Sequence, residues 1–184
     1  MQTAQQTIAR PAPTLANIPL NPSLSQSGYP YLHFAINENT QAVIPAVAAQ
    51  EVVIVPRQQI TAMPHMAPSV LGLLNRRSRI SWVLDLATLL ELPTPETPAL
   101  DYTVILVRVT VGEGLYSAAN LLGIVVQQVK GNLRLTPDLV QSPLQQYPSG
   151  LTPYLSGCVQ QDQSMVLVLS VDAIARSNAL LLNS

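Results

Sequence analysis

Charged residues are scarce in this chain. Only 10% of its 184 residues are charged, against about 25% in an ordinary soluble protein, while 48% are hydrophobic. The formal net charge of −1 gives no electrostatic reason to expect nucleic acid or an anionic membrane as a partner. Copies with so few charges repel one another weakly, so a homo-oligomer or a permanent protein partner fits this composition.

Cysteine, histidine and long apolar runs are also rare. The single cysteine, Cys158, cannot form an internal disulfide, which fits a reducing compartment. The two histidines, His33 and His65, belong to no set of residues with metal-ligand spacing, and no glycine-rich phosphate loop is present. No secretory signal and no membrane-spanning run appear. We therefore expect a cytoplasmic protein that is not an enzyme, holds no metal or cofactor and does not insert into a membrane.

The pattern of the chain predicts an all-β fold with a flexible tail. Residues 1–28 are rich in Gln, Thr, Ser, Asn and Pro and have no hydrophobic period, which predicts disorder. Short apolar or alternating segments then recur between turn residues, as strands require. The expected strands are 31–36, 41–45, 51–55, 70–74, 79–84, 102–109, 121–126, 156–161 and 165–170.

Two short helices and a proline-rich connector complete this pattern. Residues 85–92 have helical spacing with Asp85 as the N-cap, and Asp172 opens a second helix through Ala179. Gly131-Asn132 indicates a tight turn. The strands fall into two sets, each followed by a helix, which favours two small barrels over one sandwich. A nominal boundary gives subdomains at 29–100 and 101–184.

The one dense charge cluster is Arg76, Arg77 and Arg79, within otherwise apolar sequence. It is either a solvated turn or a hot spot for protein recognition, because the flat guanidinium group suits bidentate contacts at interfaces. An RNA-binding turn is a weaker third interpretation, since no further basic or aromatic platform supports it.

The segment Gly72 to Leu86 reads Gly-Leu-Leu-Asn-Arg-Arg-Ser-Arg-Ile-Ser-Trp-Val-Leu-Asp-Leu. It resembles the signature of the CheW-like domain family, Gly-Val-x-Asn-Leu-Arg-Gly-x-Ile-x-Pro-Val-x-Asp-Leu. Further stretches agree in order and spacing, so the resemblance spans about residues 31–176. They are Ile44-Pro45 before Glu51-Val52, residues 122–126 with Val129, and residues 153–157.

This resemblance implies a pair of SH3-like five-stranded β-barrels with a groove between them and a chain that crosses between the barrels. The family couples a chemoreceptor-type sensory protein to a CheA-like histidine kinase in taxis or pilus motility. The implied partners are therefore the kinase's regulatory domain and the cytoplasmic tip of a methyl-accepting chemoreceptor-type protein, with recruitment to membrane-bound receptor arrays. By position, Arg77, Asn75, Gly72 and Glu51 are the expected partner-binding residues.

Four residues depart from the family pattern and bear on partner identity more than on fold. Arg76 replaces an apolar residue, Ser78 the turn glycine, Trp82 a proline and Gln127 an aspartate. If the turn requires a positive φ, Ser78 costs about 1 kcal/mol relative to glycine, or the turn has changed type. Trp82 shares a strand face with Ile80 and Leu84, which favours a place in the core.

A second hypothesis stays open on the sequence alone. The chain would be a small-molecule-binding or enzymatic β-barrel protein with a pocket between the barrels. This hypothesis predicts polar groups that converge on a pocket near His33, His65 or Cys158.

Overall fold

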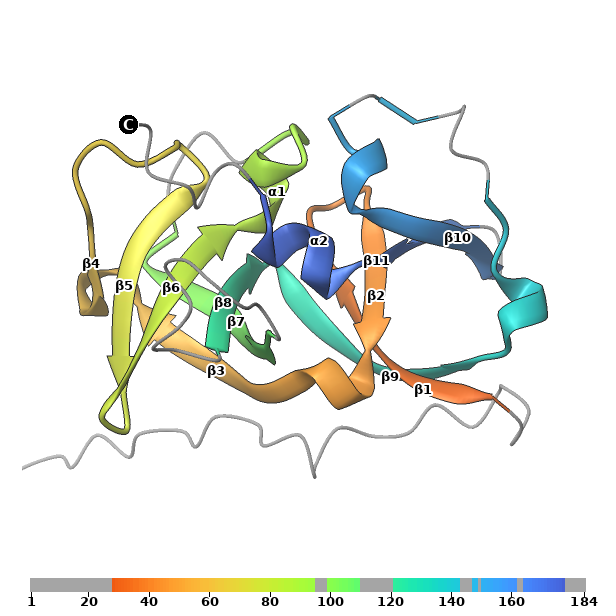
Figure 1. Ribbon diagram of the computed structural model, residues 1–184, viewed down its shortest axis with the longest axis horizontal. Coiled ribbons are helices and arrows are strands. Elements are labelled where there is room, and N and C mark those ends of the chain that lie inside the picture. The colour runs from red at the N-terminus through yellow and green to blue at the C-terminus, as the bar shows by residue number, and fades with distance from the viewer. Residues whose placement is uncertain are drawn as a thin grey trace, which may run out of the picture.

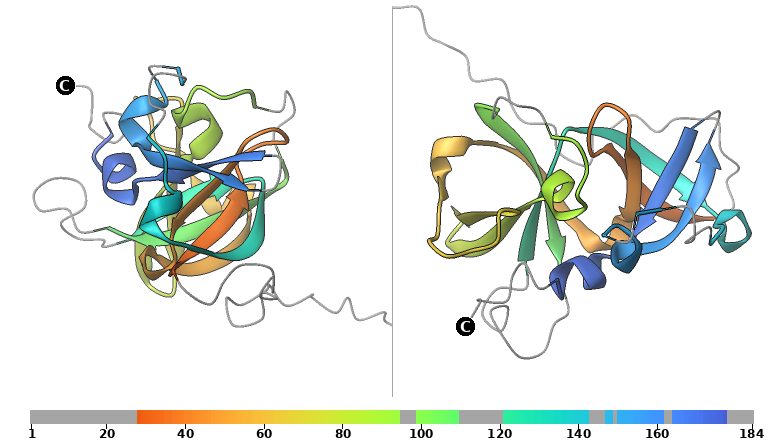
Figure 2. Two further views of the ribbon diagram at one scale, coloured as in Figure 1. Left: turned by 90° about the vertical axis from the view of Figure 1, so that its right-hand side faces the viewer. Right: turned by 90° about the horizontal axis from the view of Figure 1, so that it is seen from above.

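Two curved β-sheets lie next to each other and account for most of the chain (Figures 1 and 2). The computed structural model describes residues 28–94, 99–109, 121–142, 147–148, 150–161 and 164–177. The tail predicted over residues 1–28 lies outside this part of the chain, apart from Gly28. The two sheets with few short helices confirm the predicted all-β, two-barrel fold.

The first barrel has five strands in the order β10-β11-β2-β1-β9. Its neighbours are antiparallel except for the parallel pair β11 and β2. The strands are β1 (Tyr29–Ala35), β2 (Gln41–Pro45), β9 (Gln128–Leu135), β10 (Leu155–Gln161) and β11 (Ser164–Leu169).

The second barrel has six strands in the order β3-β7-β8-β6-β5-β4, with β6 and β8 parallel. It exceeds the expected five because the two-residue strand β4 pairs along β5. The strands are β3 (Ala49–Pro56), β4 (Ile60–Thr61), β5 (Val70–Arg76), β6 (Arg79–Asp85), β7 (Asp101–Arg108) and β8 (Leu121–Val126).

The chain crosses between the barrels twice. It leaves the first barrel after β2 through a single 3-10 turn, η2 (Ala46–Ala48), and returns from β8 to β9 through Gln127. The first barrel is therefore assembled from both ends of the chain, while the second is the segment inserted between them. The nominal boundary at residue 100 falls inside the second sheet, between β6 and β7.

The buried side chains of the described residues form three hydrophobic clusters, and several strands are buried on both faces. One cluster, which includes Val43, fills the first barrel, and another, which includes Val53, fills the second. The largest lies between the barrels and contains side chains such as Leu32 and Leu84. All six residues of β8 are buried, which explains its continuous apolar run.

Both short helices pack into the junction between the barrels (Figure 1). Helix α1 (Leu86–Leu89) begins as predicted at Asp85, whose carboxylate accepts a 2.8 Å hydrogen bond from the Thr88 amide. Helix α2 (Val171–Ala175) is capped by Ser170 and ends at Ala175, so the predicted start at Asp172 and extent to Ala179 were wrong. The other 3-10 turns within the described residues are η3 (Arg57–Gln59), η4 (Pro137–Leu139) and η6 (Thr152–Tyr154).

The tight turn predicted at Gly131-Asn132 was also wrong. Strand β9 runs through both residues, and its pairing with β1 shifts register between His33 and Phe34. Gly131 has a φ of +143° at this irregularity. A glycine with positive φ serves a bulge as well as a turn, so the dipeptide alone did not distinguish them. No helix in the described residues is long and apolar enough to cross a membrane.

Candidate functional site

The β5–β6 hairpin ends in a two-residue turn built from Arg77 and Ser78. The strands stay in register up to the pair Arg76 and Arg79, so only these two residues remain for the turn. Arg77 has φ +49° and Ser78 has φ +61°. Two positive φ values identify a type I′ turn, which matches strand twist but usually carries glycine or asparagine. The turn therefore requires positive φ at Ser78, which carries the expected cost of about 1 kcal/mol relative to glycine.

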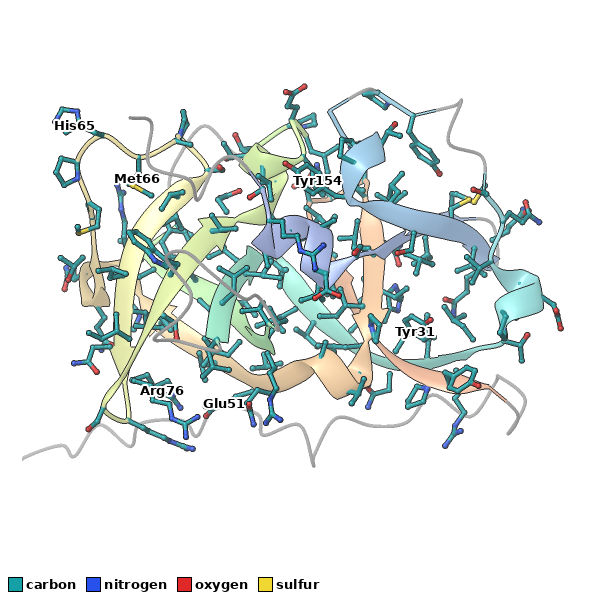
Figure 3. All side chains as sticks on the ribbon, in the orientation of Figure 1. Tyr31, Glu51, His65, Met66, Arg76 and Tyr154 are labelled. Carbon is teal, nitrogen blue, oxygen red and sulfur yellow. The ribbon has the colours of Figure 1, made fainter. Side chains whose placement is uncertain are left out.

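An ion cluster joins this turn to β3 (Figure 3). Arg76 makes two contacts with Glu51: Nη2 lies 2.7 Å from Oε1, and Nε lies 3.3 Å from Oε2. Arg77 Nη2 lies 3.4 Å from the same Oε1. One carboxylate thus faces two guanidinium groups, and Arg76 has the closer geometry.

Strand alternation explains why these side chains meet. Glu51 shares a face of β3 with Val53, and Arg76 shares a face of β5 with Leu74; both apolar residues belong to the core of the second barrel. Side chains two residues apart on a strand point to the same side. The ion pair between Glu51 and Arg76 consequently spans the open end of the barrel, beyond the last apolar layer.

The contact shifts the pKa values of both Glu51 and Arg76. The hydrogen bond from Arg76 is the main cause that lowers the pKa of Glu51, assisted by the charges of Arg76 and Arg77 and opposed by partial burial. The same hydrogen bond raises the pKa of Arg76. Both shifts favour the charged forms of Glu51 and Arg76.

The outer face of the hairpin end is open to solvent. The Arg77 side chain is 76% exposed, and Asn75 is exposed as well. Ile80, opposite Asn75 in the register, is 54% exposed although it is a large apolar residue. We call residues 75–80 the hairpin tip. An exposed apolar side chain beside arginine is the composition found in protein-binding surfaces.

Gly72 is buried, unlike the other predicted partner-binding residues. Its φ is +138°, and an added Cβ would lie 2.1 Å from the carbonyl oxygen of Thr61 on β4. Only glycine allows β4 to approach this closely. The structure thus places Arg77, Asn75 and Glu51 together at one end of the second barrel, with Gly72 inside the same sheet.

Arg76 is the member of the cluster whose role the sequence did not reveal. The sequence placed it in the arginine cluster and marked it as a departure from an apolar position, without indicating a partner for it. Its partner Glu51 lies 25 residues away on a strand that is not adjacent to β5. Two other residues that depart from the family pattern lie outside the ion cluster. Trp82 is 8% exposed in the junction core, as predicted, and Gln127 is exposed between β8 and β9.

A cavity of about 600 Å³ lies between the β1–β2 turn and the end of the second barrel where α1 begins. Four segments supply most of its lining: residues 37–39, residues 85, 87 and 88, residues 101–103 and residues 125–127. None of His33, His65 and Cys158 contributes to it.

These three residues also lie apart from one another. His33, whose pKa burial lowers, hydrogen-bonds Gln41 through Nε2 at 2.8 Å. Cys158 is fully buried in β10, and His65 lies at the end of the second barrel opposite Glu51 (Figure 3). Within the described residues no three potential ligands gather into a metal site. The hypothesis of a pocket built around these side chains is therefore not favoured.

The comparisons with known proteins agree with this geometry. The model of the CheW-like domain matches residues 30–179. The chain belongs to the CheW-like domain family. It is also similar to the crystal structure of the scaffolding protein TtCheW from Thermoanaerobacter tengcongensis, with a TM-score of 0.69 and 19% identity over 85% of this chain and 100% of that one. No curated protein matches the chain.

Family membership makes the chain a CheW-like adaptor and scaffold of chemotaxis-type signal transduction. At 19% identity, the match to TtCheW supports the fold alone. The predicted resemblance and the predicted two-barrel fold are both confirmed.

Proposed function

We propose that this CheW-like chain links a chemoreceptor-type sensory protein to a CheA-like histidine kinase, without turnover or cofactor. One surface would hold the cytoplasmic tip of the receptor, and another would dock the regulatory domain of the kinase. Such an adaptor acts in the cytoplasm at membrane-bound receptor arrays. The output would be taxis or pilus-driven motility.

The observation that carries this proposal is the hairpin tip with its ion cluster. Arg77 is held in a positive-φ turn that costs free energy, and its guanidinium group is largely exposed. Backbone strain persists where the surrounding structure enforces it, and such sites are often functional. We propose that Arg77, Asn75 and Glu51 line the receptor-binding surface, while the buried Gly72 maintains the hairpin against β4.

The proposal is tested by comparing Arg77→Ala with the unchanged chain. Binding to the receptor-tip fragment and to the kinase regulatory domain is measured by titration calorimetry, and stability by thermal melting. We expect Arg77→Ala to weaken receptor-tip binding by about 1–3 kcal/mol and to leave the melting transition nearly unchanged.

Arg134→Ala is the matched control. Arg134 is an exposed arginine on β9 of the other barrel, so its loss changes net charge equally while leaving the hairpin tip intact. It should bind the receptor tip as the unchanged chain does. Equal losses from both variants would show a general charge effect, and a parallel loss of stability and binding in Arg77→Ala would show a structural role.

A further inference from the structure

We propose that Arg76 is a specificity-determining residue that occupies Glu51, so that Arg77 and Arg79 are available to bind a carboxylate of the partner protein. This inference rests on the proposed function, because it names the chemistry by which that surface recognises its partner. Arg76 acts here through Glu51 and is a positioning residue.

The first step is the unequal sharing of the carboxylate. Arg76 reaches both oxygens of Glu51, at 2.7 and 3.3 Å, whereas Arg77 approaches only Oε1, at 3.4 Å. Strong hydrogen bonds between charged N–H donors and carboxylates are about 2.7–2.9 Å long. Arg77 thus keeps its N–H groups largely uncommitted.

The second step is the greater solvent exposure of Arg77 and Arg79 compared with Arg76. The side chain of Arg76 is 36% exposed and that of Arg77 76%. Arg79 is exposed at the other end of the turn and makes no salt bridge within the described residues. An exposed guanidinium group binds a carboxylate effectively because it presents paired N–H donors in a fixed plane.

The third step is the charge balance at this end of the barrel. The whole chain has only nine basic residues, and three of them occur in the hairpin tip. A fourth, Arg108, lies at the adjacent end of β7 and donates a 3.1 Å hydrogen bond to Gln50 Oε1, next to Glu51. In the described part of the chain, Glu51 pairs with Arg76 and Arg77, and neither Arg79 nor Arg108 makes a salt bridge. This excess of positive charge among the described residues favours an acidic segment of a partner protein.

The fourth step is what an apolar residue at position 76 would change. Without Arg76, both oxygens of Glu51 are open to Arg77, the arginine that already lies 3.4 Å from one of them. Arg77 would then turn towards Glu51 and away from the partner. The presence of Arg76 therefore determines whether Arg77 pairs with Glu51 or contacts the partner protein.

The experiment measures binding of a receptor-tip fragment to the full chain and to Arg76→Leu, Glu51→Gln and the double variant Arg76→Leu/Glu51→Gln. Thermal melting of each protein checks that it is folded. We expect Arg76→Leu to weaken binding about tenfold, because Glu51 captures Arg77. Removing the carboxylate in the double variant should recover part of the affinity that Arg76→Leu loses, because Arg77 is released again, while the loss of Glu51 from the binding surface keeps the recovery incomplete.

A matched arm uses the same fragment with its Asp and Glu side chains replaced by amides. This neutral fragment should bind weakly to every protein and should not distinguish Arg76→Leu from the unchanged chain. Unchanged binding of the original fragment by Arg76→Leu, or a double variant no better than Arg76→Leu, would overturn the inference.

A second readout separates this inference from the proposed function. The pKa of Glu51 is followed by NMR in the unchanged chain, Arg77→Leu, Arg76→Leu and Arg76→Leu/Arg77→Leu. We expect Arg77→Leu to change it little alone and to raise it clearly when Arg76 is also absent. Equal effects in both backgrounds would overturn the inference even if the fragment binds. If the NMR result holds but no receptor or kinase fragment binds the unchanged chain, the proposed function fails instead.

Discussion

The junction between the barrels and the hairpin tip show how one strand serves two purposes. On β6, Ile80, Trp82 and Leu84 share one face, yet their exposed fractions are 54%, 8% and 0%. The inner part of this face packs between the barrels with α1 and α2. The outer part continues into solvent beside a strained turn and three arginines.

This difference in burial indicates that the junction stabilises the fold and that the hairpin tip is available for binding. Burial of apolar area at the junction supplies stabilisation of about 25 cal/mol for each Å² removed from water. The hairpin tip contains two non-glycine residues with positive φ and an exposed isoleucine, features that do not stabilise the fold by themselves. Substitutions at the junction should therefore act on unfolding, and those at the tip on binding.

The largest expected effect is at the junction. Leu84→Ala should lower the free energy of unfolding by about 2–5 kcal/mol, because it leaves a cavity in a fully buried cluster. Urea-induced unfolding measures the loss. Ile80→Ala, on the same face of the same strand, is the control and should cost well under about 1 kcal/mol. Similar costs for both would mean that the junction is not where stability resides.

A smaller, pH-dependent effect is expected at the ion cluster. The pKa of Glu51 is lowered in the folded protein, chiefly by the hydrogen bond from Arg76. Its carboxylate therefore stabilises the fold above the ordinary glutamate pKa, and this contribution is lost as the pH falls through the lower folded-state pKa. We expect Glu51→Gln to cost about 1 kcal/mol at neutral pH.

Urea unfolding over a series of pH values measures this cost. The difference between Glu51→Gln and the unchanged chain should disappear in acid. In an Arg76→Gln background the same change should cost less, because the main hydrogen-bond donor is gone. A cost that persists unchanged in acid would contradict the assignment of the stabilisation to the ionised carboxylate.

The smallest effect is expected at the turn, where it should have the opposite sign. Ser78→Gly should raise the free energy of unfolding by about 0.5–1 kcal/mol, because glycine adopts positive φ without a Cβ penalty. Thermal melting detects the change. Ser164→Gly, at an exposed strand position on β11, should destabilise instead. Destabilisation by Ser78→Gly would show that the serine side chain has a role of its own.

The features that could be predicted from the sequence depend on local signals. The β5–β6 hairpin and the cap at Asp85 were predictable because turn residues, alternation and a capping side chain lie within a few positions of one another. Trp82 was assigned to the core from its strand face alone, which burial confirms. Helix α2 was predicted too long because polar and apolar spacing does not define where a short helix ends.

The features that could not be predicted depend on contacts distant in sequence. The parallel pairs β6–β8 and β11–β2 join segments with no shared turn, so only the family resemblance implied that the chain crosses between barrels. The ion pair between Arg76 and Glu51 forms across the barrel opening between strands that are not neighbours in the sheet. Local spacing contains no signal for such a contact.

Amide hydrogen exchange tests most directly whether binding occurs at the hairpin tip and not at the junction between the barrels. Exchange is measured on the unchanged chain, alone and saturated with the receptor-tip fragment. We predict slower exchange on binding at residues 75–80 and at the adjoining start of β3, with little change at the junction helices. Protection confined to the cavity-lining segments 37–39 and 85–88, with the hairpin tip unchanged, would contradict this account.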